Sequence, residues 1–437
     1  MILRLFLTLL CSSTVVVMTV SFGYASSFVT VKGHKLYRQN APYYFVGTNY
    51  WYGSLLGLEK DKKRGAERLN RELDFLKANG VTNLRLLAGA EGSGLLNGVT
   101  RVGPPLQPEK GKFDESILDG LDLVLYEMGK RGMTAVIFFS NNWEWSGGFQ
   151  QYLIWNGIVS KKWLAAKPSW DELRDIVSKF YACDPCKDGY KQQVKLVLNR
   201  KNRHTGKPYI SDPTIMAWEL ANEPRPMRPT ANEDYQRWAS DTAAMIRSID
   251  KNHLITAGHE GWIGTQDVSL FESIHADKNI DYLTIHIWPK NWGWFGDKRM
   301  VEDFPKVVSE TEKYIAENLA VAIKLDKPLV IEEFGMPRDE QSFSIRSTTV
   351  IRDEYYKKIF SYVGHQPGGK PQIAGANFWA FGGTSRPIDG QLFWKSGDEL
   401  MGDPPMEEQG LNSVFDSDRT TWEVICSVGK KAVKGLR

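Results

Sequence analysis

The 437-residue chain lacks several features that would point to particular classes of protein. After residue 25 it has no apolar run long enough to span a bilayer, so we expect no transmembrane helix there. Its formal net charge is only +3 and like charges do not cluster, which argues against binding to nucleic acid or to an anionic membrane. It also has no low-complexity linker, and we therefore expect a single domain over residues 26–437.

Cysteine is scarce as well, with four residues in the whole chain. Cys11 lies in the apolar N-terminal segment, and Cys426 has no evident partner. Cys183 and Cys186 have the spacing of a redox motif or of half a zinc site, but no second cysteine pair or His-rich segment lies nearby. We expect a local disulfide between them, which fits an oxidising compartment.

The first 25 residues have the form of a secretory signal peptide. Arg4 provides the positive charge, residues 5–20 the apolar region, and residues 23–25 the cleavage site of small residues. Because the apolar region is long, an uncleaved signal anchor is the alternative. We expect a secreted, extracellular protein, or a periplasmic one, with no membrane attachment after cleavage.

The rest of the chain alternates between short apolar runs and helix-like segments, a pattern typical of βα units around a parallel sheet. The expected strands lie at about residues 43–48, 81–87, 133–139, 215–221, 254–258, 282–287, 329–334 and 373–379. The expected helices lie at about residues 64–79, 114–130, 170–180, 187–199, 233–249, 301–323, 349–363 and 418–433. Eight strands predict an α/β fold, a (β/α)8 TIM barrel with long βα loops. Two short runs within residues 28–37 predict an N-terminal hairpin that plugs the bottom of the barrel.

Polar and aromatic side chains gather where the expected strands end, which is where barrel enzymes hold their chemistry. Glu223 and Glu333, 110 residues apart (333 − 223), each follow an apolar run. Two carboxylates on different strand ends fit the hydrolysis of a sugar bond. Glu219 and Glu332 lie on the same strands, and we expect them to pair with Arg or Lys in the barrel wall. The residues alone do not choose between Glu332 and Glu333.

The motifs at these strand ends resemble those of clan A glycoside hydrolases, specifically family 5. Residues 218–225 (Trp-Glu-Leu-Ala-Asn-Glu-Pro-Arg), 141–143 (Asn-Asn-Trp) and 377–383 (Asn-Phe-Trp-Ala-Phe-Gly-Gly) are most similar to endo-β-1,4-mannanases. The resemblance covers about residues 28–430. It implies a monomeric enzyme without cofactor or metal that cleaves internal bonds of mannan, glucomannan and galactomannan with retention. The alternatives are a β-1,4-glucanase of the same family and a non-catalytic carbohydrate-binding barrel.

The resemblance also assigns roles to individual residues. Glu223 matches the acid/base and Glu333 the nucleophile, and the Glu-Phe-Gly match selects Glu333 over Glu332. Arg85 matches an arginine bonded to the nucleophile, and His286 a histidine near the acid/base. We therefore expect Arg85 to keep Glu333 ionised, while the nearby anion keeps Glu223 protonated.

The remaining candidates are expected to contact the sugar. Asn222 matches an amide that contacts the 2-hydroxyl, and Trp379 a platform under the sugar at the cleavage point. Trp288 stands where the family has a tyrosine, and its indole can donate a hydrogen bond but cannot accept one. Further candidates are Arg225, Trp51, Trp143, Trp262 and Trp292, although each tryptophan could equally fill a core, because aromatic rings serve both purposes. The family often has a histidine near the end of strand three, and either Asn141 or Asn142 replaces it. His259 and Glu260 belong either to the site or to its scaffold.

Overall fold

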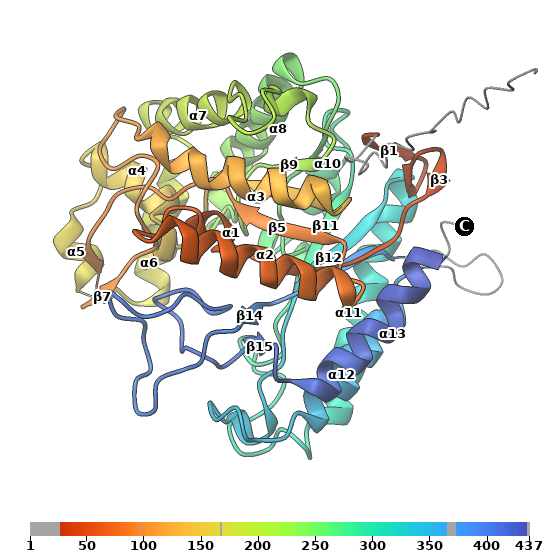
Figure 1. Ribbon diagram of the computed structural model, residues 1–437. Coiled ribbons are helices and arrows are strands. Elements are labelled where there is room, and N and C mark those ends of the chain that lie inside the picture. The colour runs from red at the N-terminus through yellow and green to blue at the C-terminus, as the bar shows by residue number, and fades with distance from the viewer. Residues whose placement is uncertain (1–26, 97, 167, 365–372, 435–437) are drawn as a thin grey trace, which may run out of the picture.

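The computed structural model describes residues 27–96, 98–166, 168–364 and 373–434 (Figure 1). The expected signal peptide lies outside these residues. At the centre is a sheet of eight parallel strands in the order β10-β9-β8-β5-β4-β13-β12-β11. The strands are β4 (Phe45–Asn49), β5 (Asn83–Leu87), β8 (Thr134–Phe138), β9 (Ile215–Glu219), β10 (Leu254–Thr256), β11 (Leu283–Ile287), β12 (Leu329–Phe334) and β13 (Ile373–Phe378). All are fully buried, as strands covered on both faces must be.

The two end strands of this order, β10 and β11, are brought together by hydrogen bonds outside the ladder. Asp281 N donates to Ile255 O at 2.8 Å, and His286 N donates to Glu260 O at 2.9 Å. The sheet therefore curls into a nearly closed barrel. The predicted α/β TIM barrel is confirmed.

Helices surround the barrel (Figure 1). They are α1 (Gly53–Leu56), α2 (Lys62–Ala78), α3 (Leu118–Lys130), α4 (Gly148–Trp155), α5 (Lys161–Ala165), α6 (Trp170–Val177), α7 (Asp184–Leu198), α8 (Asn232–Ile249), α9 (Trp262–Thr265), α10 (Val268–His275), α11 (Phe304–Leu325), α12 (Val350–Phe360) and α13 (Arg419–Lys434). The sequence pattern did not predict α10, which has only eight residues between β10 and β11. In the described part of the chain, no helix is both long enough and apolar enough to cross a bilayer.

The predicted hairpin is present and covers the N-terminal end of the barrel. Strands β1 (Val29–Lys32) and β2 (Lys35–Arg38) pair antiparallel, and β3 (Ala41–Pro42) extends the small sheet. Val29 and Leu36 pack in one apolar cluster with residues from the barrel strands, among them Met216 and Val330. This packing closes the end opposite the strand carboxyl termini.

Two long connections lie at the other end of the barrel. The first runs from β8 to β9 and contains α4, α5, α6 and α7. The second, residues 384–413, lies between the short paired strands β14 (Phe381–Gly383) and β15 (Val414–Phe415). A further two-stranded pair, β6 (Leu95–Leu96) with β7 (Val99–Thr100), follows β5.

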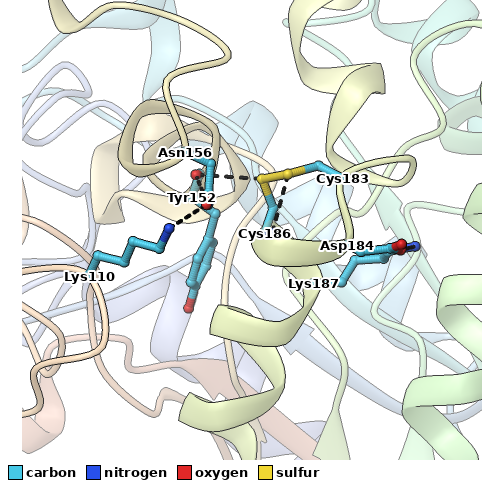
Figure 2. The surroundings of a disulfide bond; sticks show 7 residues. All are labelled: Lys110, Tyr152, Asn156, Cys183, Asp184, Cys186 and Lys187. Carbon is cyan, nitrogen blue, oxygen red and sulfur yellow. Dashed lines mark hydrogen bonds and ion pairs between the residues drawn. A yellow bond between two sulfur atoms is a disulfide. The ribbon is translucent and has the colours of Figure 1, made fainter.

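The predicted disulfide joins Cys183 to Cys186 at the start of α7 (Figure 2). Cys183 is the N-cap residue, and its Sγ accepts the backbone N–H of Cys186 at 3.2 Å. The Sγ atom of Cys186 lies 3.6 Å from the carbonyl oxygen of Tyr152 in α4. Because the disulfide closes a very short loop, we expect it to stabilise the fold only modestly. Cys426 is free.

Two buried histidines connect the end of β10 to the helices outside it. The rings of His259 and His275 lie 4.9 Å apart, and His259 Nε2 is hydrogen-bonded to the hydroxyl of Tyr235. That hydroxyl also lies 2.7 Å from the carbonyl oxygen of Pro224, directly after Glu223. Burial lowers the pKa of His259 well below its usual value and lowers the pKa of His275 to about 3.

We predict that the folded protein loses stability in acid through this histidine pair. Both histidines are neutral when folded, whereas the unfolded chain takes up protons below about pH 6.5. Their contribution to the free energy of unfolding is therefore complete above pH 6.5 and falls as the pH drops from 6.5 towards 3. Each contributes a slope of about 1.4 kcal/mol per pH unit. Urea unfolding at pH 7 and pH 5 measures how much of the free energy of unfolding is lost between these pH values. His275→Gln should reduce this loss, whereas His34→Gln, at an exposed histidine, should leave it unchanged. Equal pH dependence in wild type and His275→Gln would contradict this prediction.

Candidate active site

The site is built around the guanidinium of Arg85 on β5, which is fully buried. It binds Glu219 on β9 through two hydrogen bonds of 2.6 and 2.8 Å, and it donates to Asn222 Oδ1 at 2.7 Å. It also donates to Asn49 Oδ1 at 3.0 Å and to Glu333 Oε1. Arg85 therefore fixes the nucleophile candidate as the sequence predicted, and Glu219 pairs with it in the barrel wall.

Glu223 and Glu333 face each other across His286. The Nδ1 atom of His286 lies 2.7 Å from Glu223 Oε1 and 3.3 Å from Glu333 Oε2. Trp143 Nε1 donates to Glu223 Oε2 at 2.5 Å, and Trp288 Nε1 donates to Glu333 Oε2 at 3.2 Å. Each carboxylate thus has one indole donor, and Trp288, which stands where the family has a tyrosine, donates to the nucleophile candidate.

The charges in this cluster differ from our expectation. Burial opposes ionisation of Glu223, but the hydrogen bond and positive charge of His286 outweigh it and lower the pKa of Glu223. Burial raises the pKa of Glu333 to about 7, against the opposing charges of His286 and Arg85. Burial also opposes protonation of His286, yet the two carboxylates raise its pKa to about 10. These pKa directions favour a protonated His286 over the protonated Glu223 that we expected, and the 2.7 Å hydrogen bond between the two groups lets a proton pass to Glu223.

The same three residues are the only described set whose side chains could hold a metal ion. One ligand atom from each of Glu223, His286 and Glu333 lies within 4.8 Å of the other two. Shared protons account for this geometry, because His286 hydrogen-bonds Glu223 and lies close to Glu333. Arg85 supplies a further positive charge at Glu333.

A cavity of about 530 Å³ opens above this cluster, a volume in the range of sites for small ligands. Eight of the predicted site residues line it: Asn222, Glu223, Arg225, Glu333, Trp143, Trp288, Trp292 and Trp379. Arg225 forms an ion pair with Glu260, which also lines the cavity, and its guanidinium lies over the Trp143 ring at 5.1 Å. Arg85 and His286 lie beneath the cavity floor rather than in it, so they act on the carboxylates and not on a ligand.

Two predicted sugar-contacting tryptophans do not line the cavity. Trp51 is only 1% exposed, and its indole donates to the carbonyl oxygen of Gly402 in the 384–413 loop. Trp262 packs against Tyr314 and donates to Glu317. Both predictions are corrected, because tertiary packing uses these rings to support loops.

The structure also shows where the residues lie whose roles the sequence left open. Asn141 accepts from Asn222 Nδ2 at 3.1 Å and from the backbone N–H of Trp143, so it organises this part of the site. Asn142 is fully buried, and neither its Oδ1 nor its Nδ2 has a hydrogen-bond partner in the described part of the chain. His259 belongs to the scaffold described above. Glu332, 3.8 Å from Arg85 and 1% exposed, does not line the cavity.

Sequence reasoning missed five lining residues. They are Trp145, Trp170, Asn291, Glu407 and Asn412. Trp145 and Trp170 lie in residues 141–170, and the tryptophan content of this connection is a signal that could have identified them. Glu407 gave no local signal, because it lies within the 384–413 loop far from any strand end. Burial and the neighbouring carboxylates Asp403, Glu333 and Glu223 raise its pKa well above the usual range.

Comparison with known proteins agrees with this geometry. Residues 26–436 match the profile of a family described as GH family 5 beta-mannosidase-like. A mannan endo-1,4-beta-mannosidase of rice is 30% identical over 82% of this chain and 79% of its own length. Mannan endo-1,4-beta-mannosidase 7 of Arabidopsis thaliana is 29% identical over 81% of this chain and 78% of its own.

Solved structures are also similar. A glycoside hydrolase family 5 mannosidase variant from Rhizomucor miehei is 30% identical, with a TM-score of 0.82 over 94% of this chain and 99% of that one. An endo-1,4-beta-mannanase from the same organism is 21% identical, with a TM-score of 0.65 over 93% of this chain and all of that one. The second likeness concerns the fold alone.

We predict that Trp288→Phe shifts the acid limb of kcat/KM to higher pH. The indole donates to the ionised form of Glu333, and losing a bond to the charged form raises a carboxyl pKa. The measurement is a pH profile with a soluble β-mannoside. Trp292→Phe is the matched control, because Trp292 lines the same cavity without a hydrogen bond to either carboxylate. An unchanged acid limb in Trp288→Phe would refute the role of this bond.

Proposed function

The chain belongs to the glycoside hydrolase family 5 β-mannosidase-like family, and on that premise we propose that it hydrolyses β-1,4-mannosidic bonds with retention of configuration. The observation that carries this proposal is the pair Glu223 and Glu333 beside the cavity, with an oxygen of each within 4.8 Å of the other. Retaining glycosidases place their carboxyl groups about 5–5.5 Å apart, whereas inverting ones need room for a water between them.

The proposed reaction has two steps. Glu333 attacks the anomeric carbon, and the glycosidic bond breaks as Glu223 gives a proton to the leaving oxygen. Water then attacks the anomeric carbon and gives a proton to Glu223. The bond between this carbon and Glu333 breaks, and Glu333 leaves as a carboxylate. His286 supplies the proton that makes Glu223 an acid, and Arg85 stabilises Glu333 as an anion.

The cavity lining supports a β-mannoside substrate. Trp379, which lines the cavity together with the two carboxylates, offers a ring on which a sugar can stack. Mannose has an axial 2-hydroxyl, and we propose that it is contacted by the amide of Asn222, which Arg85 and Asn141 hold at the cavity wall. Buried polar groups that pair with a hydroxyl discriminate more strongly than shape alone. Mannan, glucomannan and galactomannan are therefore the proposed substrates, and a β-1,4-glucanase is the alternative.

The mode of attack has two candidates. Internal cleavage, as expected from the sequence, is supported by the names of the curated relatives. Cleavage from the chain end is supported by the 384–413 loop, which places Glu407 and Asn412 in the cavity wall. Trp51 and Arg68 bind the backbone of this loop on one side, and Glu408 lies 3.5 Å from Lys290 on the other.

The anchored loop favours chain-end attack. Trp143 and Arg225 lie beside the acid/base, so the leaving group must occupy their side of the cavity. The loop after Trp379 brings Glu407 and Asn412 into the cavity wall, and we infer that it restricts the space into which a long chain would have to continue. A non-catalytic binding barrel is less compatible with two carboxylates that have indole and cationic partners.

The signal-like start supports secretion, which a mature N-terminus near residue 26 in the medium would test.

We predict that Glu223→Ala and Glu333→Ala each reduce turnover by several orders of magnitude without unfolding the protein, because each removes one half of the reaction. Azide should restore part of the rate in Glu333→Ala, with inverted product, because it can attack where the carboxylate stood. Product analysis by NMR and a thermal melt of each variant provide the measurement. Either variant retaining most of its activity would show that the carboxylates are wrongly assigned.

We predict that the first products from linear mannan are mannose or short oligosaccharides cut from chain ends, with little fall in viscosity. Short manno-oligosaccharides should be better substrates than polymer, because the loop restricts the cavity on one side. Chromatographic sizing at early times with viscometry distinguishes the two modes. A rapid viscosity loss with oligosaccharides of mixed length would establish internal cleavage instead, and comparable kcat/KM on soluble cellulose would favour the glucanase alternative.

A further inference from the structure

Glu91 is a buried carboxyl that the proposed mechanism does not use. It follows β5 at the catalytic end of the barrel, yet it is fully buried and does not line the cavity. Within the described residues it forms no ion pair, since the nearby Arg101 donates instead to Gln151 and to Ser93 O. A buried carboxyl without a cationic partner is costly, so its contacts require an explanation.

Those contacts hold one segment of the first long loop. Glu91 Oε2 accepts the backbone N–H of Gly148, the first residue of α4, at 3.0 Å. Glu91 Oε1 accepts from Gln193 of α7 at 2.8 Å and from the Tyr152 hydroxyl of α4 at 3.4 Å. The backbone N–H of Glu91 donates to Ser146 O at 2.8 Å. A negative group at a helix N-terminus is also stabilised by the helix dipole.

The turn that meets Glu91 is shaped for close approach. Gly147 and Gly148 both have positive φ angles, 97° and 59°. A Cβ atom on Gly147 would lie 1.9 Å from the carbonyl oxygen of Glu91, and one on Gly148 would lie 2.2 Å from that of Asn141. Only glycine fits at either position, so the turn is pressed against Glu91 on one side and the end of β8 on the other.

The segment held in this way carries two rings of the active site. Trp143, four residues before Gly147, donates its indole N–H to the acid/base Glu223 at 2.5 Å. Trp145 lines the cavity. We propose that Glu91 is a positioning residue for acid catalysis, which holds the 143–148 segment so that the Trp143 indole stays on Glu223. This inference rests on the proposed function, because it assigns a role within the same reaction.

The charge of Glu91 supports this role. The ionised form can accept all three side-chain and backbone donors at once, whereas a protonated carboxyl or an amide must turn one atom into a donor. Burial raises the pKa of Glu91 to about 7, and the nearby Ser140 hydroxyl and the hydrogen bonds from Gly148, Gln193 and Tyr152 oppose that rise. The other titratable groups that act on it are Arg101 and the hydroxyl of Tyr190.

The test compares Glu91→Gln with wild type on two substrates that differ in their need for acid catalysis. Departure of a sugar from mannobiose requires a proton, whereas departure of 2,4-dinitrophenolate does not. Glu91→Gln should lower kcat/KM on mannobiose about tenfold and change kcat/KM on 2,4-dinitrophenyl β-mannoside less than about twofold, because kcat/KM includes only the steps up to the glycosyl–enzyme. The matched control is Glu127→Gln, which alters a buried glutamate of α3 that pairs with Arg131, and both rates should stay unchanged. Equal losses on the two substrates would overturn the proposal.

A double-mutant cycle identifies the residue through which Glu91 acts. In a Trp143→Phe background, Glu91→Gln should cause less than about a twofold further loss on mannobiose, because the indole donor is already absent. Multiplying losses would mean that Glu91 acts by another route. Wild-type inactivity on both mannosides and on linear mannan would contradict the proposed function instead, and the same comparison would then use cellobiose and the aryl β-glucoside.

Fluorine NMR of 5-fluorotryptophan-labelled protein tests the inference without activity. The Trp143 signal, identified by its loss in Trp143→Phe, should shift or broaden in Glu91→Gln and not in Glu127→Gln. An unmoved Trp143 signal would overturn the proposal even if the enzyme were inactive.

Discussion

The active site depends on the burial of one positive charge, the guanidinium of Arg85. An unpaired charge at this depth would cost several kcal/mol, so the barrel must surround it with acceptors. Asn49, Glu219, Asn222 and Glu333 provide them from strands or strand ends β4, β9 and β12. These residues are remote in sequence and meet only in the folded barrel. The nucleophile therefore reaches its position only when the barrel forms.

The second constraint is the number of protons that the cluster holds. His286 lies between Glu223 and Glu333, and the two carboxylates keep its imidazole protonated. A retaining glycosidase must begin with one carboxyl able to give a proton and the other ionised. In this arrangement the proton is stored on His286 and reaches Glu223 by a single hydrogen bond. Each carboxylate also has its own indole donor, Trp143 for Glu223 and Trp288 for Glu333.

The sequence predicted the barrel and its catalytic carboxylates because both leave local signals. Buried parallel strands are apolar runs, and Glu223 and Glu333 stand where two of those runs end. Packing between distant segments leaves no such signal. Trp51 resembled a sugar platform but supports the 384–413 loop, while Glu407, within that loop, reaches the cavity. The protonation of His286 was also hidden, because it depends on distances between three strand ends.

The central claim is that Glu223 and Glu333 act as acid/base and nucleophile in a double displacement. The most direct test is proton NMR of the first product released from a manno-oligosaccharide, recorded before mutarotation. The account predicts that the β-anomer appears first, since two inversions at the anomeric carbon restore the original configuration. An α-anomer appearing first would mean that water attacks directly, and would contradict the assignment of Glu333 as the nucleophile.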